Sequence, residues 1–321
     1  MFGRSRSERA SATTRADIAR LHTFEHWPAT RLWPMLIVSF GLGAMASVLP
    51  ATYWPVLITI WPALGAAILV FVLAFPDASH ERLHPIHWLN EAFGHVAGTL
   101  MFIPLSVYRY AHARHHANLG ATGDPELWPF NTPKTSRILR VVAAFIEIVL
   151  GFVYTPFLFL RCVVMGDLSQ RERAMVIRGY IACVITWAAI FALVYEFNLW
   201  RLFLIVAVVP MAISGILQTL NKFTQHLGLH GNTVLGLTRT VVDQHLSAEL
   251  ISSAMFYNDY HGTHHRYAKI PYYNLPPATP YTLAGASEPC PVFHNLASAF
   301  FDMLPCLTDP KVGPQWLSPT S

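Results

Sequence analysis

The sequence predicts an all-α integral membrane protein with two transmembrane helical hairpins, an interfacial helix and a cytosolic helical cap. Three observations support this fold class. Of the 321 residues, 53% are hydrophobic and only 12% are charged, whereas a soluble domain carries about 25% charged residues. Several uncharged runs are long enough to cross a bilayer. The 16 histidines gather in a few short clusters. This composition excludes an intrinsically disordered chain and argues against a soluble globular protein.

Residues 1–31 are polar and basic and precede the first apolar run. A secretory signal peptide would reach its apolar core and cleavage site sooner. We therefore expect a cytosolic N-terminal arm. A solvated tail is the simplest interpretation, and a patch that contacts the membrane surface is the alternative.

Four apolar runs form the two predicted hairpins. Residues 32–49 and 52–75 contain no charged residue and are separated by only two residues. Residues 176–195 and 199–220 form the second pair, separated by three residues. The single arginine in each of the latter two runs lies near one end of its helix, where the long side chain can reach the interface.

A fifth apolar run, residues 141–160, contains Glu147 in its middle and Pro156 near its end. If this run crossed the membrane, the histidine clusters before and after it would face opposite sides. We therefore predict an interfacial or re-entrant helix. Arginines support this topology because they concentrate on cytosolic segments. Those between the two hairpins are Arg82, Arg109, Arg114, Arg137, Arg140, Arg161, Arg171 and Arg173. Both termini and all histidine clusters should then be cytosolic.

The last hundred residues are less apolar and become rich in proline after Pro271. They should form a cytosolic cap over the membrane helices. The expected organisation is a basic arm (1–31), a membrane domain (32–280) and a C-terminal tail packed on the cap (281–321).

Histidines recur at helical spacing in three clusters, HERLH (80–84), HARHH (112–116) and HGTHH (261–265), and a further pair occurs in TQHLGLH (224–230). Spacings of three and four place side chains on one face of a helix. Pro85 complicates the first cluster because it disfavours helical geometry at the preceding residue. The candidate metal ligands are His80, His84, His112, His115, His116, His226, His261, His264 and His265.

Crowded imidazoles need partners, and a metal is the natural one because nearby acids are too few. One zinc takes four ligands, so nine candidates suit two ions of four or five ligands each. Two irons fit, with an open position for dioxygen. The residues expected to hold the ligands in place are Asp124, Glu126, Asp259 and His230. The isolated histidines, interpreted as ordinary core or surface residues, are His22, His26, His87, His245 and His294. The four cysteines contain no CxxC pair, which argues against a zinc ribbon and a disulfide scaffold.

These motifs resemble the membrane fatty acid desaturase and hydroxylase superfamily, the integral-membrane histidine-box di-iron enzymes. HERLH, followed by Asn90, Gly94 and Tyr108-Arg109 before HARHH, is similar to the run between that family's first two boxes. HHANLGATGDPE (115–126) and NDYHGTHHRYAKIPYYNLP (258–276) resemble the second and third boxes. The resemblance covers about residues 30–280 and implies four membrane helices, a cytosolic cap and two irons at the cytosolic boundary.

The sequence also departs from this family. An acidic residue often precedes the fourth group's histidine, but here Gln225 precedes His226, and His230 could substitute as a ligand. No cytochrome b5-like module is recognised. We therefore expect an external electron donor of the ferredoxin, rubredoxin or cytochrome b5 type.

Three functions are candidates for a protein with these motifs. The first is an oxygen-dependent desaturase of acyl-lipids or acyl-thioesters. The second is a sibling oxygenase, such as a fatty acid or alkane hydroxylase or a carotenoid ketolase or hydroxylase. The third is a membrane metal-binding or transport protein, which should carry ionisable residues along a path through the membrane. We expect a lipid or acyl-chain substrate, dioxygen as co-substrate, membrane lipids around the helices, and no nucleic acid partner.

Overall fold

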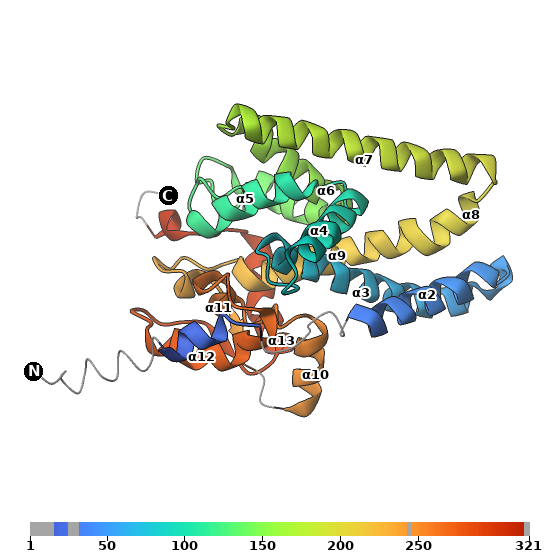
Figure 1. Ribbon diagram of the computed structural model, residues 1–321. Coiled ribbons are helices and arrows are strands. Elements are labelled where there is room, and N and C mark those ends of the chain that lie inside the picture. The colour runs from blue at the N-terminus through green and yellow to red at the C-terminus, as the bar shows by residue number, and fades with distance from the viewer. Residues whose placement is uncertain (1–15, 25–31, 243–244, 318–321) are drawn as a thin grey trace, which may run out of the picture.

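A computed structural model describes residues 16–24, 32–242 and 245–317 (Figure 1). Long helices form a bundle, and shorter elements from the C-terminal third gather at one end of it. The helices are α2 (Leu32–Val48), α3 (Trp54–Ser79), α4 (His87–Leu100), α5 (Leu105–Ala117), α6 (Arg137–Met165), α7 (Gln170–Glu196), α8 (Trp200–Phe203), α9 (Val209–His226), α10 (Leu246–Ala254), α11 (His261–Arg266), α12 (Leu275–Ala284) and α13 (Leu296–Met303).

Short elements connect these helices. A π-helical stretch, Leu204–Val208, joins α8 to α9. Two-residue strands, β1 (Thr240–Val241) and β2 (Val292–Phe293), pair in parallel with Thr240 opposite Val292. The 3₁₀ turns are Ala51–Tyr53, Leu235–Leu237, Tyr272–Asn274, Leu304–Thr308 and Pro314–Trp316. The predicted arm 1–31 and His26 lie mostly or wholly outside the described residues. Within residues 16–24, the Leu21 carbonyl accepts a hydrogen bond from Asn274 Nδ2 at 2.9 Å.

Local sequence explains where the long helices start. Ser169 and Glu172 form a reciprocal capping box at the start of α7, which satisfies two helix-end N–H groups. Ser136 Oγ accepts a hydrogen bond from the Leu139 N–H and begins α6. Proline stands in the first turns of α3 and α9, where its missing N–H is not needed.

Four helices among the described residues are long and apolar enough to cross a membrane: α3, α6, α7 and residues 200–226, which combine α8 and α9. The predicted number is therefore found. Three of the four helices, α3, α7 and residues 200–226, contain predicted runs, whereas α6 takes the place of the first predicted run, residues 32–49. Helix α6 qualifies by length and composition, whereas the described apolar part of α2, Ile37–Val48, is shorter.

Helix α6 leaves the histidine end of the bundle and returns to it. At its start, Arg140 Nε donates to the Pro310 carbonyl at 2.8 Å. Near its middle, the dihedral angles of Leu150 (φ −118°, ψ 29°) break the helical geometry. Near its end, Phe159 stacks on Tyr108 of α5 with ring centroids 5.3 Å apart. These contacts support a re-entrant helix, and the membrane placement of α6 stays a prediction.

The kinked middle of α6 packs closely on α9. A Cβ on Gly151 would lie 2.5 Å from the Gly215 carbonyl, so only glycine permits this approach. Glu147, fully buried, accepts a hydrogen bond from Lys222 Nζ. A buried carboxylate needs such a partner, and this pairing explains how an acid fits inside an apolar helix.

The two connections at the opposite end of the bundle lie together. Arg201, in α8, donates to the carbonyl of Leu49, which follows α2. Trp61 of α3 donates through Nε1 to the Ile205 carbonyl at 3.1 Å. The α2–α3 and α7–α8 connections therefore share one end, and the histidine clusters occupy the other.

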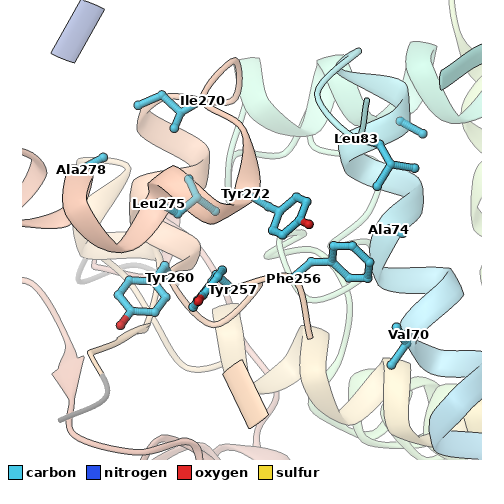
Figure 2. Packing of buried hydrophobic residues seen from close by; sticks show 11 residues of the cluster. Val70, Ala74, Leu83, Phe256, Tyr257, Tyr260, Ile270, Tyr272, Leu275 and Ala278 are labelled. Atoms are coloured by element: carbon cyan, nitrogen blue, oxygen red, sulfur yellow. The ribbon is translucent and has the colours of Figure 1, made fainter. Parts of the chain in front are cut away.

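A hydrophobic cluster joins the C-terminal segments to α3 (Figure 2). Phe256 and Tyr272 point toward Val70 and Ala74 on α3. Leu83, in the turn after α3, belongs to the same cluster. Tyr272 is 0% exposed and Phe256 3%. Burying aromatic side chains of this size contributes several kilocalories per mole, at about 25 cal/mol per Å² of apolar surface. This cluster fixes the third histidine segment against the first.

The C-terminal tail contacts the rest of the chain through its backbone. The Gly228 N–H donates to the Lys311 carbonyl at 2.8 Å, and the Val312 N–H to the Phe130 carbonyl at 3.0 Å. Asp309 pairs with Arg140 of α6. The division into an arm, a membrane domain and a tail stays a prediction.

The return of α6 generates a topological prediction. Cysteines placed at Lys134 and Asp167, in a background with Cys290 and Cys306 changed to serine, should both react with a membrane-impermeant maleimide from the same side of sealed vesicles. Opposite reactivity would mean that α6 crosses the membrane.

Candidate metal centre

The first histidine segment begins where α3 ends. His80 is the C-cap of α3, with its N–H bonded to the Pro76 carbonyl at 3.0 Å. The next residue, Glu81, has a φ of 61°, which a helix interior does not accommodate. The chain therefore turns away, and His84 lies beyond the helix. The predicted sharing of one helix face by His80 and His84 is wrong.

The second and third segments do form helices. HARHH occupies the last turns of α5, and HGTHH forms most of α11. Gly262 allows α11 to lie against β1, because a Cβ there would stand 2.5 Å from Thr240 Oγ1. The Gly262 N–H donates to the same oxygen at 3.0 Å.

Eight of the nine predicted ligands come together as two groups of four. Within each group, one ligand nitrogen from every histidine lies within 4.8 Å of the others. The first group is His80, His112, His116 and His264, and the second is His115, His226, His261 and His265. The groups adjoin: the rings of His116 and His265 stack with centroids 4.3 Å apart.

The two helical segments contribute to both groups in a crossed pattern. In α5, His112 and His116 face the first group and His115 the second. In α11, His261 and His265 face the second group and His264 the first. On a helix, the side chain at i+4 is rotated slightly to one side of the side chain at i, and the side chain at i+3 is rotated to the opposite side. Each helix can therefore direct its histidines to two neighbouring points. The last ligand of each group comes from the end of a long helix, α3 or α9.

Outer hydrogen bonds orient three of these rings. His112 Nδ1 lies 2.9 Å from Glu126 Oε1, and His115 Nδ1 lies 2.9 Å from the carboxylate of Asp124. His226 Nδ1 lies 3.0 Å from the Leu237 carbonyl. Since each partner is an acceptor, each Nδ1 donates, and each Nε2 directs a lone pair into the centre.

Asp124 is itself held rigidly. It is 1% exposed, and its oxygens accept hydrogen bonds from the N–H groups of Gly120 and Glu126, each at 3.0 Å. The prediction that Asp124 and Glu126 support the ligands fits this geometry, with one carboxylate for each group.

Electrostatics favour neutral imidazoles over most of the site. Burial lowers the pKa of His264 to about 3, with further lowering by His112 and His115. Burial likewise lowers the pKa values of His261 and His265. Neutral imidazole is the form that binds a metal.

The pKa values of Glu126 and His115 shift in opposite directions. Burial raises the pKa of Glu126, but the charges of His115 and His112 more than offset it and lower the pKa to about 2. Burial lowers the pKa of His115, but Asp124 and Glu126 raise it to about 9. A carboxylate partner of this kind makes a histidine a more basic ligand.

The donor set fits divalent metal ions. Nε2 atoms of His226 and His261 lie 2.8 Å apart, and those of His261 and His265 3.0 Å apart. In the other group, Nε2 of His80 is buried without a hydrogen-bond partner. Converging ring nitrogens and an unpartnered buried one suit a cation, and imidazole is a ligand for iron as well as zinc.

Three predicted residues lie outside the two groups. His84 Nδ1 accepts a hydrogen bond from the Ile86 N–H at 2.9 Å, and Asn90 clamps the His84 backbone. His230 is half-buried beside Gly313. The Asp259 carboxylate accepts a 2.6 Å hydrogen bond from Ser252. Their roles at a metal site stay predictions.

Gln225 and Lys222 connect separate segments through hydrogen bonds that the sequence did not predict. Gln225 Nε2 donates to the carbonyl of Asn258 at 3.1 Å, which ties α9 to the third histidine segment. Lys222 Nζ donates to the backbone carbonyl of Glu126 at 3.2 Å and also to Glu147. In the sequence, these hydrogen bonds of Lys222 were indicated only by Glu147, an acidic residue inside an apolar run.

Comparison with known proteins identifies similar sequences. The sequence profile described as "Fatty acid desaturase" matches residues 51–295. An sn-1 oleoyl-lipid 12-desaturase from Synechocystis sp. (strain ATCC 27184 / PCC 6803 / Kazusa) is 25% identical over 183 residues, which is 54% of this chain and 51% of that protein. An sn-1 acyl-lipid omega-3 desaturase (ferredoxin) from Nostoc sp. (strain 36) is 29% identical over 87 residues, 27% of this chain and 24% of that protein.

A third relative is an endoplasmic reticulum omega-3 fatty acid desaturase from Vigna radiata var. radiata. It is 27% identical over 88 residues, 27% of this chain and 22% of that protein. The chain therefore matches between about a quarter and a half of the length of these relatives.

The two groups predict about two metal ions per chain in protein purified anaerobically with iron. His264→Ala should lower the metal content by about one ion, because that group loses a quarter of its ligands. His294→Ala is the matched control, since His294 is exposed and lies outside both groups. Asp124→Asn should weaken metal retention by about 10- to 100-fold. Elemental analysis at equal protein amounts tests this, and a single zinc without iron would contradict it.

Proposed function

Because this chain belongs to the fatty acid desaturase family, we propose that it is an oxygen-dependent di-iron desaturase that introduces a double bond into the acyl chain of a lipid or thioester. The observation that carries the proposal is the pair of adjoining four-histidine groups, each with its own supporting carboxylate. The relatives named above act on acyl chains by their names, and we extend that substrate class to this chain.

The histidine groups would hold two irons, which when bound supply the oxidation of an unactivated C–H bond with dioxygen. Formation of one double bond removes two hydrogens from the acyl chain. Reduction of dioxygen to two waters takes four electrons, of which the substrate provides two. An external donor must therefore deliver two electrons, and two protons must enter with them. We propose a one-electron carrier of the ferredoxin, rubredoxin or cytochrome b5 type.

Three cavities lie in sequence along one face of α9 and offer a path for an acyl chain. The first is lined by Tyr108 and Glu126, which both contact His112. The second shares Gln218 and Met101 with the first. Together with the third, this row runs from Lys222 to Val208 along the helix, about 20 Å at 1.5 Å per residue.

The walls of this row are mostly apolar, and their polar groups lie near the histidine end. Gln218, Thr219 and Lys222 line the first cavity, whereas the third is lined only by apolar and aromatic side chains, among them Trp187 and Phe203. Apolar walls exclude water and bind methylene groups without directing them. The chain would thus contribute the position of the reacting carbon and a dry environment for it.

Product analysis tests the reaction. The protein and its His264→Ala variant are expressed at equal membrane levels in a host that lacks the activity, and total fatty acids are analysed by gas chromatography and mass spectrometry. We expect a new alkene only with the unmodified protein. An oxygenated product would assign the chain to the sibling hydroxylases or ketolases instead, and no oxygen-dependent product from iron-loaded protein would contradict the proposal.

Met101 lines all three cavities, so its side chain should limit how far an acyl chain enters. Met101→Trp should lower kcat/KM for long acyl chains at least about tenfold relative to short ones, and Met101→Ala should favour longer chains. The control is Met165→Trp, because Met165 is 73% exposed at the end of α6. Equal effects of Met101→Trp on all chain lengths would contradict this role.

A further inference from the structure

Helix α10 presents an apolar face that no described part of the chain covers. Leu246, Leu250 and Ile251 are 75%, 64% and 57% exposed. At about 100° per residue, these three side chains fall within an arc of about 140°, and Glu249 lies outside that arc. Ser252, on the opposite side, is buried. Ser247 is also exposed within the arc, and the exposed Glu249 lies beside it. The exposed surface of α10 is therefore mainly apolar, which is the opposite of a helix that faces water.

Packing contacts give the depth at which α10 ends. Phe256 and Tyr257 follow α10 directly and belong to the same buried cluster as Val70 and Ala74 of α3 (Figure 2). Val70 precedes the end of α3 at Ser79 by nine residues, which is about 13 Å of helix. The C-terminal end of α10 thus lies beside α3 well below the histidine level.

The start of α2 lies at the same depth. Ala46 of α2 packs with Leu57 and Ile60 of α3 next to their connection. The two helices are antiparallel and both rise about 1.5 Å per residue, so each step back along α2 corresponds to one step forward along α3. The start of α2 at Leu32 therefore lies level with positions 71–74 of α3. In Figure 1, α10 runs across the direction of α3 and α9 rather than along it.

We propose that α10 is an interfacial anchor helix, whose Leu246, Leu250 and Ile251 insert into the membrane at the boundary between headgroups and acyl chains. If the chain enters the bilayer at the start of α2, the membrane boundary lies at the depth of α10. The apolar face of α10 then meets lipid. A helix that lies in the interface plane with an apolar side toward the acyl chains is a recognised mode of membrane attachment. The proposal rests on α2 and α3 as helices within the membrane and not on the reaction.

The anchor is connected to the candidate metal centre through its inner face. Ser252 Oγ donates to Asp259 Oδ1 at 2.6 Å, and the Asp259 carbonyl accepts from the Val241 N–H at 2.9 Å. Asp259 precedes His261 by two residues. Insertion of α10 would therefore fix the height of the third histidine segment relative to the bilayer, in addition to the cluster around Tyr272.

Site-directed fluorescence in phosphatidylcholine nanodiscs tests the proposal with the full chain. Single cysteines replace Leu250, Glu249, Ile185 and Ser287 in turn, with Cys290 and Cys306 changed to serine, and each carries an environment-sensitive label. Ile185, 63% exposed in the middle of α7, is the lipid control. Ser287, exposed after α12, is the water control, and Glu249 is the matched control within α10.

Iodide in the buffer and a doxyl group near the headgroup of the lipid serve as the two quenchers. The label at position 250 should be quenched by the doxyl lipid and protected from iodide at least fivefold relative to position 287. The label at 249 should be more accessible to iodide than the label at 250. If position 250 is as accessible to iodide as position 287, α10 faces water and the proposal is wrong, whether or not the chain is a desaturase. A size-exclusion profile and a thermal unfolding midpoint equal to those of the unmodified protein verify that each variant is folded.

Discussion

The arrangement of the whole molecule depends on one constraint, the convergence of eight imidazole nitrogens in two adjoining groups. Two short helices with the same H-x-x-H-H spacing achieve most of it, because each gives two ligands to one group and one to the other. The remaining ligand of each group comes from the end of α3 or α9. The long helices must therefore end at the same level, and the loops between them must bring α5 and α11 face to face.

The charge distribution follows from the same constraint. Each group has a single carboxylate behind it, Asp124 for one and Glu126 for the other. Asp124 is buried and Glu126 is half-buried, and both are held in place, Asp124 by backbone N–H groups and Glu126 by His112. Behind them, Lys222 links the backbone of Glu126 to the carboxylate of Glu147. A chain of buried polar groups of this kind is stable only when its members are paired, which accounts for the acid inside the apolar helix α6.

The membrane helices and the C-terminal segments are held together by different means. Glycines at positions 151 and 215 let α6 and α9 approach at backbone distance, as small residues do between helices in lipid. The C-terminal segments attach instead through their own large aromatic side chains, which pack against α3. Tyr272 is wholly buried there. Burial of apolar surface drives association in water, whereas between helices in lipid close packing has to replace it.

The sequence by itself determined the features that depend on local spacing and composition. Apolar runs of membrane length predicted four spanning helices, of which three are found among the long apolar helices. The spacing of three and four predicted the ligand-bearing helices α5 and α11, because helical periodicity is a property of neighbouring residues. Tertiary structure decided the rest. The sorting of ligands into two groups, the tie from Gln225 to Asn258 and the pairing of Lys222 with Glu147 all depend on contacts between residues far apart in the chain. Periodicity carries no information on such contacts, since it does not specify which faces of which helices meet.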